Sequence, residues 1–269
     1  MGKIISIASQ KGGVGKTTTT LNLGFSLSRF GNRVLLIDGD PQGGMTIASN
    51  VKRRTTLGII DLLKGGHGLG DIVMQTRDRT LSVAGIGRLE PEDVFLLEEA
   101  AKDGRLGKII KAVASKFDYV LLDAPAGVGG IVTALLTVSD SVILVVLCKT
   151  LSLKTLPSFL TMTKWVRDNK NPQLKLEGIV FSMLDRRNPI EAELLAEFKT
   201  SLPEEIFFKS LLPFDELIEK ASGRSFPVAL MPDSQQANKY YIDLALELKE
   251  REMLAQTGGG ADEQNTGLF

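Results

Sequence analysis

The sequence predicts an α/β fold: a doubly wound, mostly parallel β-sheet with helices on both faces. Short runs rich in aliphatic and β-branched residues alternate with longer helical stretches along the chain, which is the pattern of strands joined by crossover helices. Some runs, such as 119–122, are continuously apolar, as expected for strands that are covered on both faces. A chain of 269 residues with 43% hydrophobic residues can bury a core of this class.

The alternation can be divided into individual elements. The predicted strands are 3–9, 33–38, 81–85, 119–123, 141–147, 176–183 and 205–211. The predicted helices are 16–30, 93–116, 130–138, 152–169, 190–200, 214–221 and 235–254. Because no repeat or linker divides the chain, we expect one domain over 1–255. The polar, glycine-rich stretch 256–269 has little to bury and is expected to be a disordered tail.

Composition excludes several classes of function. Lys+Arg and Asp+Glu balance at 32 each, so binding to nucleic acid or anionic lipid would need a local patch. A lone cysteine, Cys148, and a lone histidine, His67, cannot build a metal site of Cys and His ligands. No apolar run approaches the roughly 20 residues that span a bilayer, and no signal-peptide pattern is seen. We therefore expect a cytoplasmic protein.

A glycine-rich turn joins the first predicted strand to the first predicted helix. It reads Lys11-Gly12-Gly13-Val14-Gly15-Lys16-Thr17-Thr18. Its glycines let backbone N–H groups converge on phosphate oxygens, and the helix start adds a positive dipole end. In a phosphate-binding loop, Lys16 neutralises β/γ-phosphate charge, Thr17 ligates Mg²⁺ and Thr18 donates to an α-phosphate. The strict pattern requires glycine at position 10, where this chain has Gln10 followed by Lys11.

This loop resembles the deviant Walker A loop of the ParA/MinD family of ATPases, and the resemblance covers about residues 1–250. It implies a P-loop ATPase that binds ATP and Mg²⁺. It also implies that Lys11 reaches across an ATP-dependent homodimer to the partner's nucleotide, so that Lys11 and Lys16 both act in catalysis. Because the chain shows no built-in arginine finger, we expect slow hydrolysis that a partner protein accelerates.

Two predicted strands end in carboxylates, and ligands bind at strand ends in open parallel sheets. The first of these strands, 33–38, ends in Asp38 and continues into Gly39-Asp40-Pro41-Gln42. By the resemblance, Asp40 orients or deprotonates the attacking water, and Asp38 lies nearer Mg²⁺. From the residues alone, an ordinary turn carboxylate is an equal interpretation for each. The second strand, in segment 118–127, reads as a Walker B strand in which Asp123 holds Mg²⁺ through water, followed by a switch over 124–130.

Base recognition is expected after two later strands. Met183 ends one of them and Pro213 follows the next, and similar segments line the adenine pocket in the resembled family. We therefore expect Met183 and Pro213 to touch the base. An ordinary core position is the alternative for both.

The resemblance implies a partition or positioning ATPase. Under this hypothesis the ATP dimer binds nonspecific DNA on the nucleoid. A cargo adaptor triggers hydrolysis, and this adaptor is of the ParB type or another kind. The candidate DNA contacts are Arg186, Arg187, Lys209 and Arg224, with 52–54 (Lys-Arg-Arg) as a further basic run. Residues 200–250 contain five basic and nine acidic residues, so this segment lacks the excess of Lys and Arg that binding to DNA phosphates needs. Each candidate can also be an ordinary solvated charge.

Two other functions are possible on the same fold. A membrane-cycling ATPase of the MinD type, acting in division-site or flagellar placement, would want a basic amphipathic C-terminal helix. Residues 258–269 contain no Lys or Arg, so membrane binding is disfavoured. A metabolic enzyme, such as an ATP-dependent amide synthetase, would need a second polar substrate pocket, and the sequence shows none.

Overall fold

The computed structural model describes residues 2–51, 55–185 and 187–257. Their strands form one sheet in the order β3-β4-β2-β5-β1-β6-β7. The strands are β1 Lys3–Ser9, β2 Val34–Asp38, β3 Val73–Gln75, β4 Leu81–Ala84, β5 Tyr119–Ala126, β6 Ser141–Leu147 and β7 Lys175–Ser182. Neighbouring strands pair in parallel except β3 and β4, which are antiparallel. The predicted doubly wound, mostly parallel sheet is confirmed.

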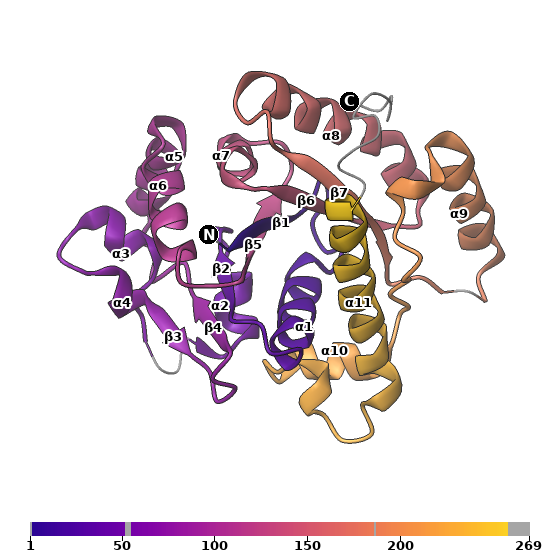
Figure 1. The fold of residues 1–269 in the computed structure, drawn as a ribbon, viewed down its shortest axis with the longest axis horizontal. Helices are drawn as coiled ribbons and strands as arrows, with labels where there is room; N and C mark the ends of the chain where they lie inside the picture. Colours follow the sequence, from indigo (N-terminus) through magenta and orange to yellow (C-terminus); the bar gives the residue numbers. More distant parts are fainter. Residues whose placement is uncertain (1, 52–54, 186, 258–269) are drawn as a thin grey trace.

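Helices cover both faces of the sheet (Figure 1). On one face lie α1 Lys16–Arg29, α2 Gly44–Ala48, α10 Glu216–Gly223, the 3₁₀ helix η3 Val228–Leu230 and α11 Gln235–Thr257. On the other lie α3 Ile59–Lys64, α4 Leu69–Ile72, α5 Pro91–Asp103, α6 Arg105–Ala114, α7 Gly130–Val138, α8 Thr150–Asn169 and α9 Pro189–Ser201, followed by the 3₁₀ helix η2 Glu204–Ile206. None of the described helices is long and apolar enough to cross a membrane.

Several predicted elements were wrong in detail. The expected strand over 205–211 is a short 3₁₀ helix, and only Phe207 forms an isolated bridge, to Ile179 on β7. The expected helix over 93–116 is broken at Gly104, whose φ of 85° ends α5 and begins α6. Strand β3 and the short helices α2 to α4 were not predicted. Helix α11 continues to Thr257, so the first two residues of the expected tail are helical, and 258–269 lie outside the described residues.

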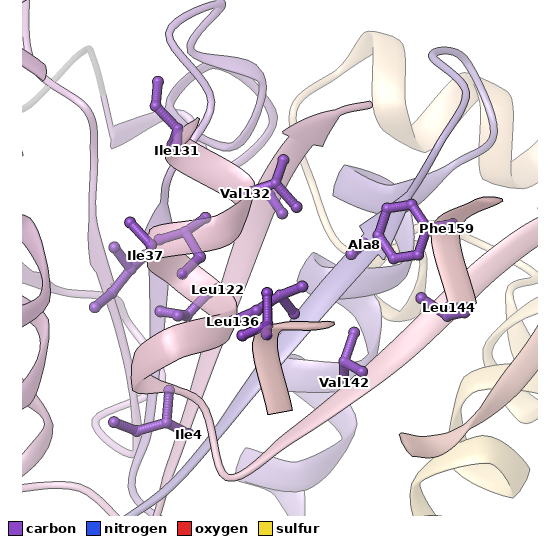
Figure 2. Close-up of a cluster of buried hydrophobic side chains, with 14 of the residues drawn as sticks. Ile4, Ala8, Ile37, Leu122, Ile131, Val132, Leu136, Val142, Leu144 and Phe159 are labelled. Carbon is purple, nitrogen blue, oxygen red and sulfur yellow. The ribbon is translucent and has the colours of Figure 1, made fainter. Parts of the chain in front are cut away.

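One core lies between α7, α8 and the sheet. Figure 2 shows Ile131, Val132 and Leu136 of α7 over side chains of four strands. The strand residues labelled there are Ile4, Ala8, Ile37, Leu122, Val142 and Leu144, with Phe159 of α8 beside them. Each of these side chains is at most 8% exposed. This packing against α7 and α8 fixes the central strands β2, β5, β1 and β6, and so fixes the points at which the loops after these strands begin.

The opposite core lies under α1 and α11, which lie side by side (Figure 1). Helix α1 approaches β2 so closely that a Cβ on Gly24 would lie 2.4 Å from Leu36 Cδ2. Polar contacts fix α11 at its C-terminal half. There the Arg251 guanidinium lies 4.3 Å from the centroid of the Phe208 ring, and Lys3 Nζ lies 2.9 Å from Glu252 Oε1. This packing sets the position of α1, and the α1 N-terminus begins the candidate site.

Candidate active site

The glycine-rich loop lies between the carboxyl end of β1 and the start of α1. Gly13 and Gly15 have φ values of 70° and 83°, a left-handed region that favours glycine. Gly15 is the N-cap of α1, so the unpaired N–H groups of the first helical turn follow it directly. The loop has the backbone that binding of phosphate oxygens requires.

Lys16, the first residue of α1, is only 7% exposed. Its Nζ donates to the Lys11 carbonyl oxygen at 3.4 Å. Burial lowers the pKa of Lys16, whereas the nearby charges of Asp123 and Asp40 oppose that shift. A buried ammonium next to unpaired backbone donors is suited to bind an anion. Lys11 is only partly buried, and Gly12 and Gly13 beside it are exposed.

A hydroxyl and a carboxylate meet directly behind the loop. Thr17 Oγ1 donates to Asp123 Oδ2 at 2.6 Å, and Thr20 Oγ1 lies 3.4 Å from Asp123 Oδ1. Asp123 is 1% exposed, and its burial raises the pKa of the carboxyl to about 7. Mg²⁺ takes few protein carboxylates and completes its shell with phosphate oxygens and waters. Thr17 and Asp123 therefore offer a donor set that fits Mg²⁺ beside a bound nucleotide.

Asp38 is the last residue of β2 and Asp40 lies two residues further on, and the two have different surroundings. Asp38 is fully buried, and its Oδ2 accepts from the Thr46 amide at 2.7 Å and the Thr46 hydroxyl at 2.6 Å. Burial raises the pKa of Asp38 to about 6, against the effect of these hydrogen bonds. Asp40 is partly buried, and its Oδ1 accepts from the Gln42 amide at 2.9 Å. Asp38 thus ties α2 to the end of β2, whereas Asp40 is more accessible.

Thr46 was missed by sequence reasoning. Its hydroxyl donates to Asp38 and also accepts from the Ile86 amide at 3.1 Å. Helix α2 also lies close to the metal donors, because a Cβ on Gly44 would lie 3.0 Å from Thr17 Oγ1. A threonine eight residues after a strand-end aspartate carries no local signal. The segment 38–46 therefore emerges as one hydrogen-bonded unit only in the structure.

Met183 and Pro213 lie together beside the phosphate loop. Both line a cavity of about 60 Å³, as do Gly15 and Thr18. Strand β7 is tied to the loop because the Ser182 hydroxyl donates to the Val14 carbonyl at 2.6 Å. Ser182 and Ser222 line the same cavity as Met183 and Pro213, and they were not predicted from the sequence as site residues. The structure therefore brings both expected base contacts next to the expected phosphate site.

The candidate DNA contacts come from separate segments. Arg186 and the run 52–54 lie outside the described residues. Arg187 follows β7 and pairs locally, with its Nε 3.1 Å from Asp185 Oδ1. Lys209 precedes α10, and its amide donates to Glu247 Oε1 at 2.8 Å. Arg224 is the C-cap of α10. The Arg187 side chain is thus already paired with a carboxylate, which weakens the local positive potential there.

The loop, its buried lysine and the hydroxyl–carboxylate pair at the strand ends define a P-loop nucleotide-binding protein. Residues 2–176 match the family model described as an AAA domain. The chain is 32% identical over 250 residues to the sporulation initiation inhibitor protein Soj of Bacillus subtilis, covering 92% of this chain and 98% of Soj. It is 31% identical over 256 residues to the chromosome partitioning protein ParA of Caulobacter vibrioides, covering 93% and 95%.

A solved structure agrees with these relatives. The cell division ATPase MinD of Pyrococcus furiosus superposes with a TM-score of 0.76 at 25% identity, over 93% of this chain and 99% of that one. The chain belongs to the ParA/MinD family of deviant Walker A ATPases. The family resemblance inferred from the sequence is confirmed, and so is the assignment as an ATPase of the partition and positioning type.

Proposed function

We propose that this chain is an ATP-dependent dimerisation switch that partitions or positions a cargo, such as a plasmid, a chromosome segment or a cellular body. The observation that carries the proposal is the arrangement of two lysines in one loop. Lys16 is buried at the helix start, while Lys11 lies partly exposed five residues earlier. Residues 1–255 would act as one domain, since every described strand belongs to the same sheet.

Each residue of the loop has a role in ATP binding. The amides over 12–16 and the Lys16 ammonium would hold the β- and γ-phosphates, and Thr18 would donate to the α-phosphate. Thr17 and Asp123 would hold Mg²⁺, which supplies neutralisation of phosphate charge when it is bound. Met183 and Pro213 would flank the adenine, since they line the same cavity as Thr18.

Hydrolysis would depend on Asp40 and Lys11. Asp40 is accessible and its backbone turn is fixed by the Gln42 amide, so its free carboxylate oxygen can orient or deprotonate a water. Asp38 lies opposite Asp123 on the neighbouring strand, so it would lie near the metal, and it would also hold Thr46 and thus the segment between Asp40 and α2. Lys11 would reach the γ-phosphate of the partner subunit. Hydrolysis would remain slow until an adaptor, of the ParB type or another cargo protein, binds the dimer.

The ATP dimer would bind nonspecific DNA and so associate with the nucleoid. A chromosome partitioning protein among the relatives supports this step. The basic residues Arg187, Lys209 and Arg224 are the described candidates for phosphate contact. We expect a modest affinity, because the Arg187 side chain is already paired with Asp185.

The proposal is tested with Asp40→Ala, which should trap the ATP state. Binding to unrelated duplex DNA is followed by fluorescence anisotropy with ATP or ADP, at low and moderate salt. We expect binding that requires ATP and weakens as salt rises, because Lys and Arg release counterions from DNA. The double variant Asp40→Ala/Lys11→Ala serves as the control that cannot dimerise. A dimer that forms with ATP but binds no DNA at either salt would contradict the nucleoid step.

A membrane-cycling function is the second candidate, and one observation favours it. Near the end of α11, Met253 and Leu254 are exposed apolar side chains, and such residues can insert into a bilayer interface. Co-sedimentation of the trapped ATP dimer with anionic vesicles tests this function. Sedimentation with vesicles that is lost in Met253→Glu/Leu254→Glu, together with absent DNA binding, would favour it over the nucleoid.

A further inference from the structure

A second, larger hollow lies on the face of the sheet that α1 covers. It is a groove of about 650 Å³, within the range of sites that bind ligands or peptide side chains. Its described lining residues are not shared with the cavity beside the phosphate loop. The apolar lining residues are Leu21 and Phe25 of α1, Met74 of β3, Leu81 and Val83 of β4, Val51, Phe226 and Leu230. We propose that this groove docks an acidic amphipathic helix of a partner protein.

The groove marks a place where the helical layer of the sheet is incomplete. Sheets of this class are covered by helices on both faces. On this face α2, α1 and α11 lie side by side over the central strands, while β4 and β3 form the outer edge (Figure 1). Leu81 and Val83 of β4 line the groove there. A further helix about 10 Å across would continue the layer.

Exposed apolar side chains form one wall of the groove. Phe226 and Leu230 lie between α10 and α11, and they are 43% and 58% exposed. Two large apolar side chains beside a hollow lined by Phe25 and Met74 form a surface that a partner's apolar stripe would cover. A helix with leucines at i, i+3, i+4 and i+7 presents such a stripe.

The charged residues at the rim specify an acidic partner. Arg29 and Arg77 both line the groove and are exposed. Arg29 lies 3.8 Å from Asp78 with its side chain 69% exposed, and Arg77 has no ion-pair partner within 4.0 Å among the described residues. The Asp78 carboxylate is already bonded to Thr80, at 2.5 Å from its hydroxyl. The groove is therefore lined by two guanidinium groups, of Arg29 and Arg77, and by one carboxylate, of Asp78. The excess positive charge can pair with Glu or Asp side chains of a partner.

The backbone is also unusual around this groove. Among the described residues, the non-glycine positions with positive φ are Asn50, Met183, Ser225 and Asp233. Asn50 and Ser225, both with φ of 59°, line the groove, and Met183 lines the nucleotide cavity. Such conformations cost free energy and concentrate at ligand-binding segments. Non-glycine residues with positive φ thus occur both in this groove and in the cavity beside the phosphate loop.

The walls of the groove are bonded to the elements that hold the nucleotide. Asn50 follows α2, which Thr46 ties to Asp38. On the other wall, the Val228 amide donates to Asn22 Oδ1 at 2.7 Å, and Asn22 Nδ2 donates to the Thr18 carbonyl at 2.8 Å. A helix that contacts both walls would therefore bind the ATP and ADP states with different affinities. This last step rests on the proposed switch function, whereas docking itself does not.

The test uses three fluorescent 14-residue peptides and the full chain. The first has Leu at i, i+3, i+4 and i+7 with Glu at the exposed positions, the second has Lys in place of each Glu, and the third is a scramble of the first. Fluorescence anisotropy is measured with ATP and Mg²⁺ and with ADP and Mg²⁺. We expect the acidic peptide to bind at least about tenfold more tightly than the other two, a difference of about 1.4 kcal/mol. We also expect its affinity to differ between the two nucleotides.

Matched variants locate the binding. Leu230→Glu and Arg77→Glu should each weaken the acidic peptide at least about fivefold. Leu246→Glu on α11 and Arg88→Glu, which change the same residue types outside the groove, should not. Equal binding of the Lys peptide, or equal loss in the control variants, would overturn the proposal. Self-association of the chain that Leu230→Glu abolishes would assign the groove to a second copy, which would also overturn it.

The outcome is separable from that of the proposed function. If DNA binding by Asp40→Ala behaves as expected and no acidic peptide binds the groove, the docking inference alone fails. If the acidic peptide binds and the groove variants abolish its binding, while no ATP-dependent DNA binding is seen, the docking inference stands and the nucleoid step fails.

Discussion

Thr17 Oγ1 donates to Asp123 Oδ2 across 2.6 Å, joining the first turn of α1 to the end of β5. The two residues are 106 positions apart in the sequence. Their approach depends on the parallel pairing of β1 with β5, which places Ile7 opposite Asp123. Under the proposed function, this pair would hold Mg²⁺ beside the bound nucleotide.

Asp123→Asn should strongly slow Mg²⁺-dependent hydrolysis while the hydrogen bond from Thr17 is kept. The amide oxygen can still accept from the Thr17 hydroxyl, but it carries no charge to hold the cation. We expect a loss of at least about 100-fold in kcat, consistent with loss of several kcal/mol of electrostatic stabilisation. Phosphate release is the measurement. A variant that keeps wild-type hydrolysis would show that Asp123 is not a metal-holding residue.

The same carboxyl predicts a pH dependence of stability in the nucleotide-free, metal-free protein. Burial raises the pKa of Asp123 from 3.8 to about 7, so the folded state binds a proton more tightly than the unfolded state. This contribution to the free energy of unfolding is complete below about pH 4 and is lost as pH rises towards about 7. Asp123→Asn should therefore gain stability relative to wild type across that window. Urea unfolding with EDTA at pH 5 and pH 8 measures the free energy of unfolding of both proteins. If the difference between Asp123→Asn and wild type is the same at the two pH values, the raised pKa of Asp123 is contradicted.

Gly15→Ala should reduce ATP affinity at least about tenfold. Its φ of 83° is unfavourable for alanine, and the added Cβ would lie 3.4 Å from Met183 Cε in the nucleotide cavity. Gly31→Ala is the matched control, because its φ is 85° and no atom lies within 4 Å of the added Cβ. Both variants should lose about 1 kcal/mol of stability. Only the first should weaken ATP binding, which calorimetric titration measures; equal losses would mean that strain alone is responsible.

Thr46→Val should destabilise the segment between Asp38 and α2. The substitution removes the hydroxyl that donates to Asp38 and accepts from Ile86, which leaves both groups short of a partner. We expect a loss of about 1–3 kcal/mol in the free energy of unfolding, together with slower ATP hydrolysis. Thr46→Ser should restore most of both. If Thr46→Ser fails to restore activity, the hydroxyl is not what positions this segment.

The predicted strands match the observed ones where the local sequence pattern and the global fold agree. The runs that form β1, β2, β5 and β6 are mostly apolar, as expected for strands that are buried on both faces, and the glycine-rich loop has a fixed spacing. The predicted strand over 205–211 is wrong, because its apolar side chains pack against β7 without forming a strand ladder. The predicted helix over 93–116 is wrong at Gly104, where one left-handed residue ends α5.

The candidate site was predicted in outline, and its internal bonding was not. Lys16 and Thr17 belong to the glycine-rich loop motif, and Asp123 ends an apolar strand. These patterns predict from the sequence alone that the three residues lie together. Thr46 and Ser182 carry no such spacing, because their partners Asp38 and Val14 are selected by how α2 and β7 pack. The groove beside Phe226 was equally invisible, since its walls come from segments far apart in the chain.

The central claim is that ATP makes two copies of this chain associate through Lys11. Sedimentation equilibrium of Asp40→Ala with ATP and Mg²⁺, with ADP and Mg²⁺, and of Asp40→Ala/Lys11→Ala with ATP and Mg²⁺ tests it most directly. The account predicts a dimer of about twice the 29.2 kDa chain mass in the first sample and monomers in the other two. A monomer with ATP, or a dimer that persists without the Lys11 side chain, would contradict it.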